Sequence, residues 1–247
     1  DNQGPKTLEA IHNRHCGWFF EVAQDEFKKI PGSPVAYWVG ESVRNVFDQG
    51  APLKNIGDTR QGMATSDNGR FLRNWPEVSW QFVCADAADR ESAKASGATW
   101  FPYNKGGEFR KYFGNIDFVV NWKNDGSELL GYAASLYGSP TRTIKSISEY
   151  FKPSISWSKI SSGSLAMRAF PEGFLFDVAG CCIFSEEKRD REWLLAFTNS
   201  AVVRHLLSAI SPTLNFEAGQ IAQLPLLTQK IEIEEVIPRV CNLVEQA

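Results

Sequence analysis

The sequence predicts an α+β fold, in which helices flank a twisted, mostly antiparallel sheet. Aromatic and turn-forming residues are abundant, with 17 Phe, 8 Trp, 19 Gly and 12 Pro among 247 residues. This composition favours strands and tight turns over a helical bundle. The pattern over 99–184 is mostly that of strands, whereas helical periodicity is found near both ends of the chain.

The first half of the chain indicates two helices. Residues 1–33 look irregular and lead into the breaker Pro-Gly-Ser-Pro at 31–34. Ser33 is the expected N-cap and Pro34 the first helical residue, and helical spacing then continues to Phe47 until Gly50 ends it. A second helix is expected over 86–96.

The second half predicts strands at 116–122 and 173–178. One long amphipathic helix is expected over 192–210, because Pro212 cannot continue it. A last helix is expected from residue 231 to 244. We therefore divide the chain into an N-terminal segment and helix over 1–50, a main domain over 51–228, and the start of a further helix over 229–247.

The charge is unevenly distributed along the chain. The net charge of −3 argues against a generic nucleic-acid coat protein. Residues 101–170, however, hold nine Lys/Arg against five Asp/Glu, a net +4, while the segments before and after are acidic. This basic middle is a modest electrostatic signal for a phosphate-bearing partner.

Cysteine usage and hydropathy predict a cytoplasmic protein. No apolar run approaches the roughly 18–20 residues that a membrane span needs. The five cysteines have no C-x-x-C spacing, which is typical of reduced thiols.

The residues show no catalytic, cofactor or metal site. The sequence has no G-x-G-x-x-G and no phosphate-binding glycine loop, no carboxylate–lysine cluster of a nuclease and no Ser/His/Asp set. His12, His15 and Cys16 would need a fourth ligand to hold zinc, so a solvated segment is favoured. Cys181 and Cys182 are adjacent in a strand and should point to opposite faces.

The segment 100–115 is the first candidate for contact with DNA. Gly106 and Gly107 permit a left-handed backbone and close approach of a ligand. Lys105, Arg110 and Lys111 supply charge for phosphate, which sets register rather than sequence. A tight turn with solvated cations is an equally good interpretation.

Two further segments have side chains suited to DNA. In 156–168, hydroxyls and cations fit backbone or groove contacts, although an ordinary hairpin has the same pattern. In 60–70, Arg60 and Gln61 are types that read guanine and adenine edges, although a surface loop would look similar. The DNA-contacting residues we predict are Arg60, Gln61, Asn68, Arg70, Asn104, Lys105, Gly106, Gly107, Arg110, Lys111, Lys123, Lys159, Ser161, Ser162 and Arg168.

Six strings in this order resemble a known family: TRQGMATSDNGRF (59–71), WFPYNKGGEFRKYFGN (100–115), NWKNDG (121–126), SWSKISSG (156–163), FPEGFLFDVAG (170–180) and LNFEAGQIAQLP (214–225). Over about 30–247 the chain resembles the C-terminal specificity region of the PglX family, the adenine-specific DNA methyltransferases of BREX phage-defence systems. Type IIG restriction-modification enzymes have a similar region.

The resemblance implies a target-recognition-domain-like fold over 51–228 that binds double-stranded DNA, and a spacer helix from 229. Methyl transfer from S-adenosylmethionine would occur in a separate methylase domain, whose Asn-Pro-Pro-Tyr/Phe motif this sequence lacks. The extruded adenine would be held there, because its amine is unreachable in the stack. Two alternatives remain open: a module that binds other BREX proteins or a phage DNA mimic, and a free-standing nuclease.

Overall fold

The computed structural model of the chain describes residues 3–161, 163–211, 213–226 and 233–246. Its α-helices are α1 (Gln3–His12), α2 (Glu41–Gln49), α3 (Asn68–Phe71), α4 (Arg90–Ala95), α5 (Lys123–Tyr137), α6 (Lys188–Thr198), α7 (Ala201–Ile210), α8 (Ala218–Ile221) and α9 (Ile233–Glu245). Its strands are β1 (Ala51–Pro52), β2 (Asp58–Arg60), β3 (Leu72–Asn74), β4 (Trp100–Asn104), β5 (Phe118–Asn121), β6 (Ser154–Ser158), β7 (Met167–Phe170), β8 (Leu175–Phe176), β9 (Gly180–Phe184) and β10 (Pro225–Leu226).

The strands form two four-stranded sheets and one short ribbon. The central sheet has the order β2-β9-β6-β7, the second has the order β3-β5-β4-β8, and β1 pairs with β10. Every pairing within these sheets is antiparallel except that of β4 with β8. The predicted α+β class with mostly antiparallel pairing is confirmed, and the strands divide between two sheets where one was expected.

The central sheet separates two hydrophobic cores. On β6, Ile155 and Trp157 belong to the core that α6 and α7 cover, while the alternating serines face the second sheet. On β9, Cys181 lies in the first core and Cys182 in the other, so the prediction that their side chains point opposite ways is confirmed. Both faces of the central sheet are therefore buried.

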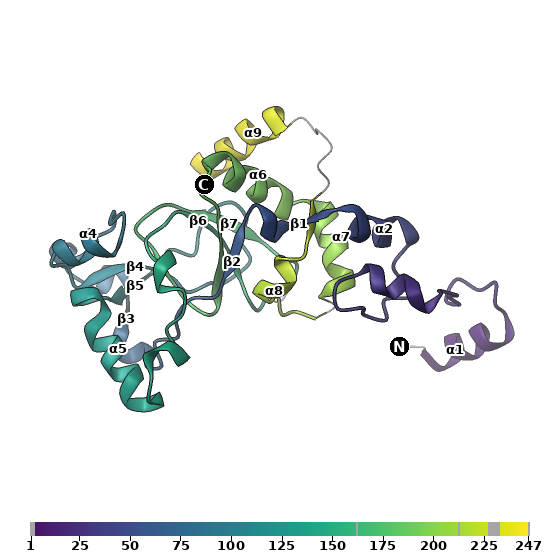
Figure 1. Cartoon of the computed structure of the whole chain (residues 1–247), viewed down its shortest axis with the longest axis horizontal. Helices are drawn as coiled ribbons and strands as arrows, with labels where there is room; N and C mark the ends of the chain where they lie inside the picture. Colours follow the sequence, from purple (N-terminus) through teal and green to yellow (C-terminus); the bar gives the residue numbers. More distant parts are fainter. Residues whose placement is uncertain (1–2, 162, 212, 227–232, 247) are drawn as a thin grey trace.

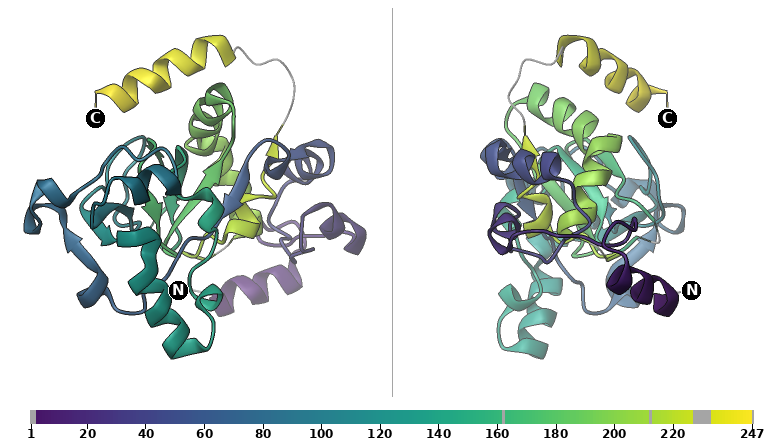
Figure 2. Two further views of the ribbon diagram at one scale, coloured as in Figure 1. Left: turned by 60° about the vertical axis from the view of Figure 1, so that its left-hand side comes forward. Right: turned by 90° about the vertical axis from the view of Figure 1, so that its right-hand side faces the viewer.

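The two cores lie side by side along the molecule. Figure 1 shows the second sheet with α4 and α5 at one end, α2 and α7 toward the other, and the central sheet between them. Helix α1 lies beyond α2 and buries none of its residues. Both views in Figure 2 place α9 beside α6 at the edge of the molecule, and the two helices are in contact.

Two predicted helices begin or end elsewhere. The helix expected from Pro34 starts only at Glu41, after Gly40, because Ser33 has φ 47° and an N-cap needs an extended backbone. The stop at Gly50 is confirmed. The helix expected over 86–96 is shorter, since Asp89 caps α4 through the amide of Ser92.

The long helix expected over 192–210 is two helices, α6 and α7, bent by 74°. The break has a tertiary cause. The Asn199 side chain leaves the helix to bond both the amide and the carbonyl of Met167, at 3.0 and 2.9 Å. Ser200 then caps α7 through the amide of Val203. Taken singly, no helix in the described residues has the length and apolarity to cross a membrane.

Four α-helices of the described residues were not predicted: α1, α5 and the one-turn helices α3 and α8. Helix α1 falls in the segment expected to be irregular. Helix α5 falls in the region interpreted as strands, and its first turn contains three residues with left-handed backbone, Asn124, Asp125 and Gly126. These residues have the composition of a turn, so the helix behind them was missed. The last helix is confirmed from Ile233 onward, and residues 231–232 lie outside the described residues.

Candidate nucleic-acid interface

Asp177 joins the segments that the sequence singled out. Its side chain is 4% exposed and accepts hydrogen bonds from the Tyr103 hydroxyl at 2.7 Å and the Ala179 amide at 2.8 Å. Lys105 Nζ lies 2.9 Å from the same carboxylate. The backbone beside Asp177 also pairs with Met63, in the 59–71 segment. Strings far apart in the sequence thus meet at one buried carboxylate.

The Tyr103 hydroxyl is fully buried in this cluster. Burial, followed by the charge of Asp177, holds its pKa well above the usual range for tyrosine. Tyr103 therefore stays a neutral donor to Asp177 at physiological pH. The cluster thus joins the segments that meet at Asp177 through hydrogen bonds to one carboxylate.

A left-handed turn at Gly106 brings the loop after β4 against the central sheet. Gly106 has φ 73°, and a Cβ there would lie 2.6 Å from the carbonyl oxygen of Ala179. The Asn104 side chain accepts from the Gly106 amide at 3.1 Å and donates to Ser156 Oγ at 2.6 Å. Asn104 is 1% exposed, so its amide shapes this turn and cannot reach a base edge.

Arg168 lies beneath the same loop and is fully buried. Its guanidinium donates to Ser158 Oγ at 3.2 Å and to the Arg110 carbonyl at 3.4 Å. Burial lowers the pKa of Arg168 to about 10. We therefore no longer propose DNA contacts for the side chains of Asn104 and Arg168, because a duplex cannot reach buried groups.

The outer part of the loop is exposed. Gly107, Glu108, Phe109 and Arg110 are all exposed, and Phe109 keeps 51% of its surface. Within the part of the chain that the structure describes, no carboxylate pairs with the Arg110 guanidinium. We call residues 107–110 the loop tip.

Lys111 differs from its neighbour Arg110. Its ammonium group donates to the Asn199 carbonyl at 2.7 Å. Burial and the nearby charge of Arg204 lower its pKa. Lys111 is thus tied to the bend between α6 and α7, and Arg110 is the free cation of this pair.

The 59–71 segment runs from β2 of the central sheet to α3, which lies beside α5. Arg60 pairs with Asp58 at 2.6 Å, and the Gln61 carbonyl accepts from Ser146 Oγ. Arg70 pairs with Glu128 of α5 at 2.8 Å. Asn68 is exposed at the start of α3.

A shallow groove of about 310 Å³ brings two predicted segments together. Asn68 and Lys105 both line it, with Arg73 and Phe118 between β3 and β5. The Arg73 guanidinium also lies over the Trp100 ring, 5.6 Å from its centroid. Sequence analysis did not single out Arg73, since nothing in its local pattern showed that it would border Lys105.

The hairpin between β6 and β7 carries three more of the predicted residues, Lys159, Ser161 and Ser162. Lys159 Nζ lies 3.1 Å from Glu217, and Ser161 Oγ bonds locally to the Ser164 carbonyl at 3.4 Å. Ser162 lies outside the described residues. Ile160, in the same hairpin, has 72% of its surface exposed.

Further exposed cations also lack an ion-pair partner among the described residues, among them Lys123, which sequence analysis predicted, and Arg142 and Lys145, which it missed. The last two flank Thr143, whose carbonyl accepts from the amide of Ala64 at 2.8 Å, so they lie beside the 59–71 segment. Their only sequence signal was the positive count over 101–170.

Two comparisons bear on this arrangement. The chain is 38% identical over 227 residues to the adenine-specific methyltransferase PglX of Lacticaseibacillus casei (strain Zhang), covering 90% of this chain and 18% of that protein. It is 36% identical over 232 residues to the adenine-specific methyltransferase BrxX of Escherichia coli O9:H4 (strain HS), covering 92% of this chain and 18% of that protein. The chain is related to the BREX adenine-specific methyltransferases. It spans less than a fifth of the length of these two relatives, and no family model matches it.

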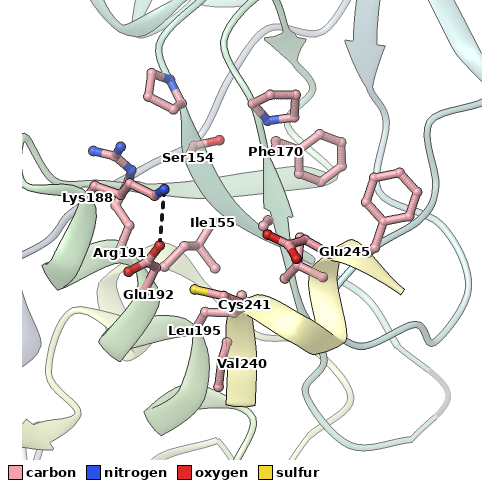
Figure 3. Close-up of a pocket in the computed structure, with 15 residues that line it drawn as sticks. Ser154, Ile155, Phe170, Lys188, Arg191, Glu192, Leu195, Val240, Cys241 and Glu245 are labelled. Atoms are coloured by element: carbon pink, nitrogen blue, oxygen red, sulfur yellow. Dashed lines mark ion pairs between the residues drawn. The ribbon is translucent and has the colours of Figure 1, made fainter. Parts of the chain in front are cut away.

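A methyltransferase relative raises the question of a cofactor site. A cavity of about 370 Å³ lies between α9, α6 and the edge of β6 and β7 (Figure 3). Its walls are mainly apolar, with the Lys188–Glu192 ion pair at 3.6 Å on one side. None of the described residues that line it is a glycine, so the cavity has no glycine-rich turn of the kind that dinucleotide-binding folds use.

Metal ligation was the other open question. The described residues contain no group of three or more His, Cys, Asp or Glu side chains placed to hold a metal ion. His12 and His15 are exposed in and after α1, with Cys16 half-buried beside them.

Proposed function

We propose that this chain is the part of a BREX-type adenine-specific DNA methyltransferase that recognises the target sequence in double-stranded DNA. The observation that carries the proposal is the convergence of the family-like strings on Asp177, in a chain whose relatives are adenine-specific methyltransferases. A rigid scaffold that presents variable loops is the usual way to place recognition residues.

In this proposal Arg110 of the loop tip and three further exposed cations supply the charge for DNA. Arg110, Lys123, Arg142 and Lys145 are exposed cations without an ion-pair partner among the described residues. Unpaired cations are the groups that gain most from phosphate, because no existing salt bridge has to break. Arg60, Arg70 and Lys159 pair with carboxylates, so each would have to give up its carboxylate partner to bind a phosphate.

Methyl transfer is assigned to the remainder of the parent protein. The relatives are more than five times as long as the matched region, which leaves room for a methylase domain that holds S-adenosylmethionine and the extruded adenine. In this proposal the chain contributes register and sequence discrimination, and the neighbouring methylase domain is its partner.

The test is a salt titration of binding to a short fluorescent DNA duplex. If the Arg110 guanidinium contacts one phosphate, Arg110→Ala should lower the slope of log affinity against log salt by about 0.9. Lys28→Ala is the control, because Lys28 is exposed, already pairs with Asp25 and belongs to the segment 24–29 that contacts α2. A wild-type chain that binds no duplex at low salt would overturn the proposed function.

A further inference from the structure

Arg168 is a buried cation without a counter-ion. It is 0% exposed on β7, and no carboxylate lies within ion-pair distance of it in the described residues. Its Nε has no hydrogen-bond partner. Burying an unpaired charge is costly, so an arginine here needs a reason other than packing.

The side-chain hydrogen bonds of Arg168 lead, directly or through Ser158, to the loop after β4. Its Nη2 donates to Ser158 Oγ at 3.2 Å, and that hydroxyl donates onward to the Gly107 carbonyl at 2.7 Å. Its Nη1 donates to the Arg110 carbonyl at 3.4 Å. One guanidinium is therefore linked to the first and the last residue of the loop tip.

The backbone beside Arg168 holds the same loop. The Tyr112 amide donates to the Met167 carbonyl at 2.8 Å, and the Ala169 amide donates to the Tyr112 carbonyl at 2.8 Å. The residues on either side of Arg168 thus fasten the end of the loop, and its side chain reaches under the tip. From β7, a long side chain with several N–H donors, such as arginine, is needed to reach both the Ser158 hydroxyl and the Arg110 carbonyl.

We propose that Arg168 is a positioning residue for DNA binding, which fixes residues 107–110 so that the Arg110 side chain is presented to a phosphate. This inference rests on the proposed function. Arg168 does not touch DNA. It acts through Arg110 by restricting the conformations that the loop tip samples before binding, which reduces the entropy lost on association.

Three variants separate positioning from packing. Arg168→Met keeps the apolar length and removes both donors, and removal of the unpaired charge offsets the lost hydrogen bonds in stability. Arg168→Lys keeps the charge but loses the fork. Arg44→Met is the matched control, because Arg44 is also a buried arginine but pairs with Glu26 beside α2.

The first readout is hydrogen exchange of peptides that cover residues 104–113. We expect faster exchange in Arg168→Met, with a thermal unfolding midpoint close to that of the wild type. Arg168→Lys should be intermediate. Arg44→Met should lower the unfolding midpoint and leave exchange at 104–113 unchanged. Wild-type exchange of this loop in Arg168→Met would overturn the inference.

The second readout is a double-mutant cycle on duplex DNA. Arg168→Met should weaken binding about tenfold, the loss expected for one charge-assisted contact, and should lower the salt slope as Arg110→Ala does. The double variant Arg168→Met/Arg110→Ala should bind like Arg110→Ala alone. Losses that multiply would overturn the inference while the proposed function stands, whereas a wild-type chain that binds no duplex would overturn the proposed function itself.

Discussion

The support for the candidate interface depends on Asp177, and its removal should destabilise the fold measurably. Asp177→Ala deprives the Tyr103 hydroxyl, the Ala179 amide and the Lys105 ammonium of a shared acceptor. Two of these losses are moderated, since Tyr103 also reaches the Met63 carbonyl at 3.1 Å and the Lys105 side chain is 27% exposed. The net loss in the free energy of unfolding should be about 3 kcal/mol. Asp177→Asn keeps one acceptor oxygen and should lose about half as much.

Thermal unfolding and urea titration measure this effect. For a chain of this size, 3 kcal/mol corresponds to a drop of roughly 6–12 °C in the unfolding midpoint. The matched control is Asp58→Ala, because Asp58 and Arg60 form an ion pair in which both side chains are about half exposed. That pair should contribute less than about 1 kcal/mol. Equal losses in the free energy of unfolding for Asp177→Ala and Asp58→Ala would show that the buried hydrogen bonds of Asp177 do not stabilise the fold as proposed.

Two other predictions concern the turn and the thiols. Gly106→Ala should lower the free energy of unfolding, measured in urea, by about 2–4 kcal/mol, because φ is 73° and the new Cβ would meet the Ala179 carbonyl. The control is Gly131→Ala on the exposed side of α5, where nothing lies within 4 Å; it should raise the free energy of unfolding by about 0.5–1 kcal/mol. Equal effects of the two substitutions would contradict the close approach at Gly106. Burial raises the pKa of Cys181 to about 12 and that of Cys182 to about 11. Because the thiolate is the reactive form, both thiols should resist alkylation near neutral pH until the chain unfolds. The half-buried Cys16 and Cys84 should react first, as measured by mass spectrometry of the alkylated chain. Rapid labelling of Cys182 in the folded chain would contradict this prediction.

The alternation of side chains along strands was the feature that the sequence predicted best. It predicted the opposite orientation of Cys181 and Cys182, because side chains of successive strand residues point to opposite faces. Helix boundaries were less predictable where a tertiary contact decides them. Nothing local in 192–210 shows that Asn199 will bond Met167 and break the helix.

The candidate site was predictable in its segments and not in its side chains. The glycines of 100–115 did mark a close approach of backbone, since Gly106 meets Ala179. Charge alone could not separate exposed Arg110 from buried Arg168, because burial depends on which strand packs beneath the loop. Arg142 and Lys145 were missed because their proximity to Ala64 is a tertiary contact.

In the proposed function this chain recognises a DNA sequence. The most direct measurement incubates the chain with a pool of short duplexes whose central positions are randomised, recovers the bound fraction and sequences it. We expect enrichment of one motif that contains adenine, and we expect Arg110→Ala to lower the total bound DNA without changing the motif. Bound DNA with the composition of the input pool would contradict the claim of sequence recognition.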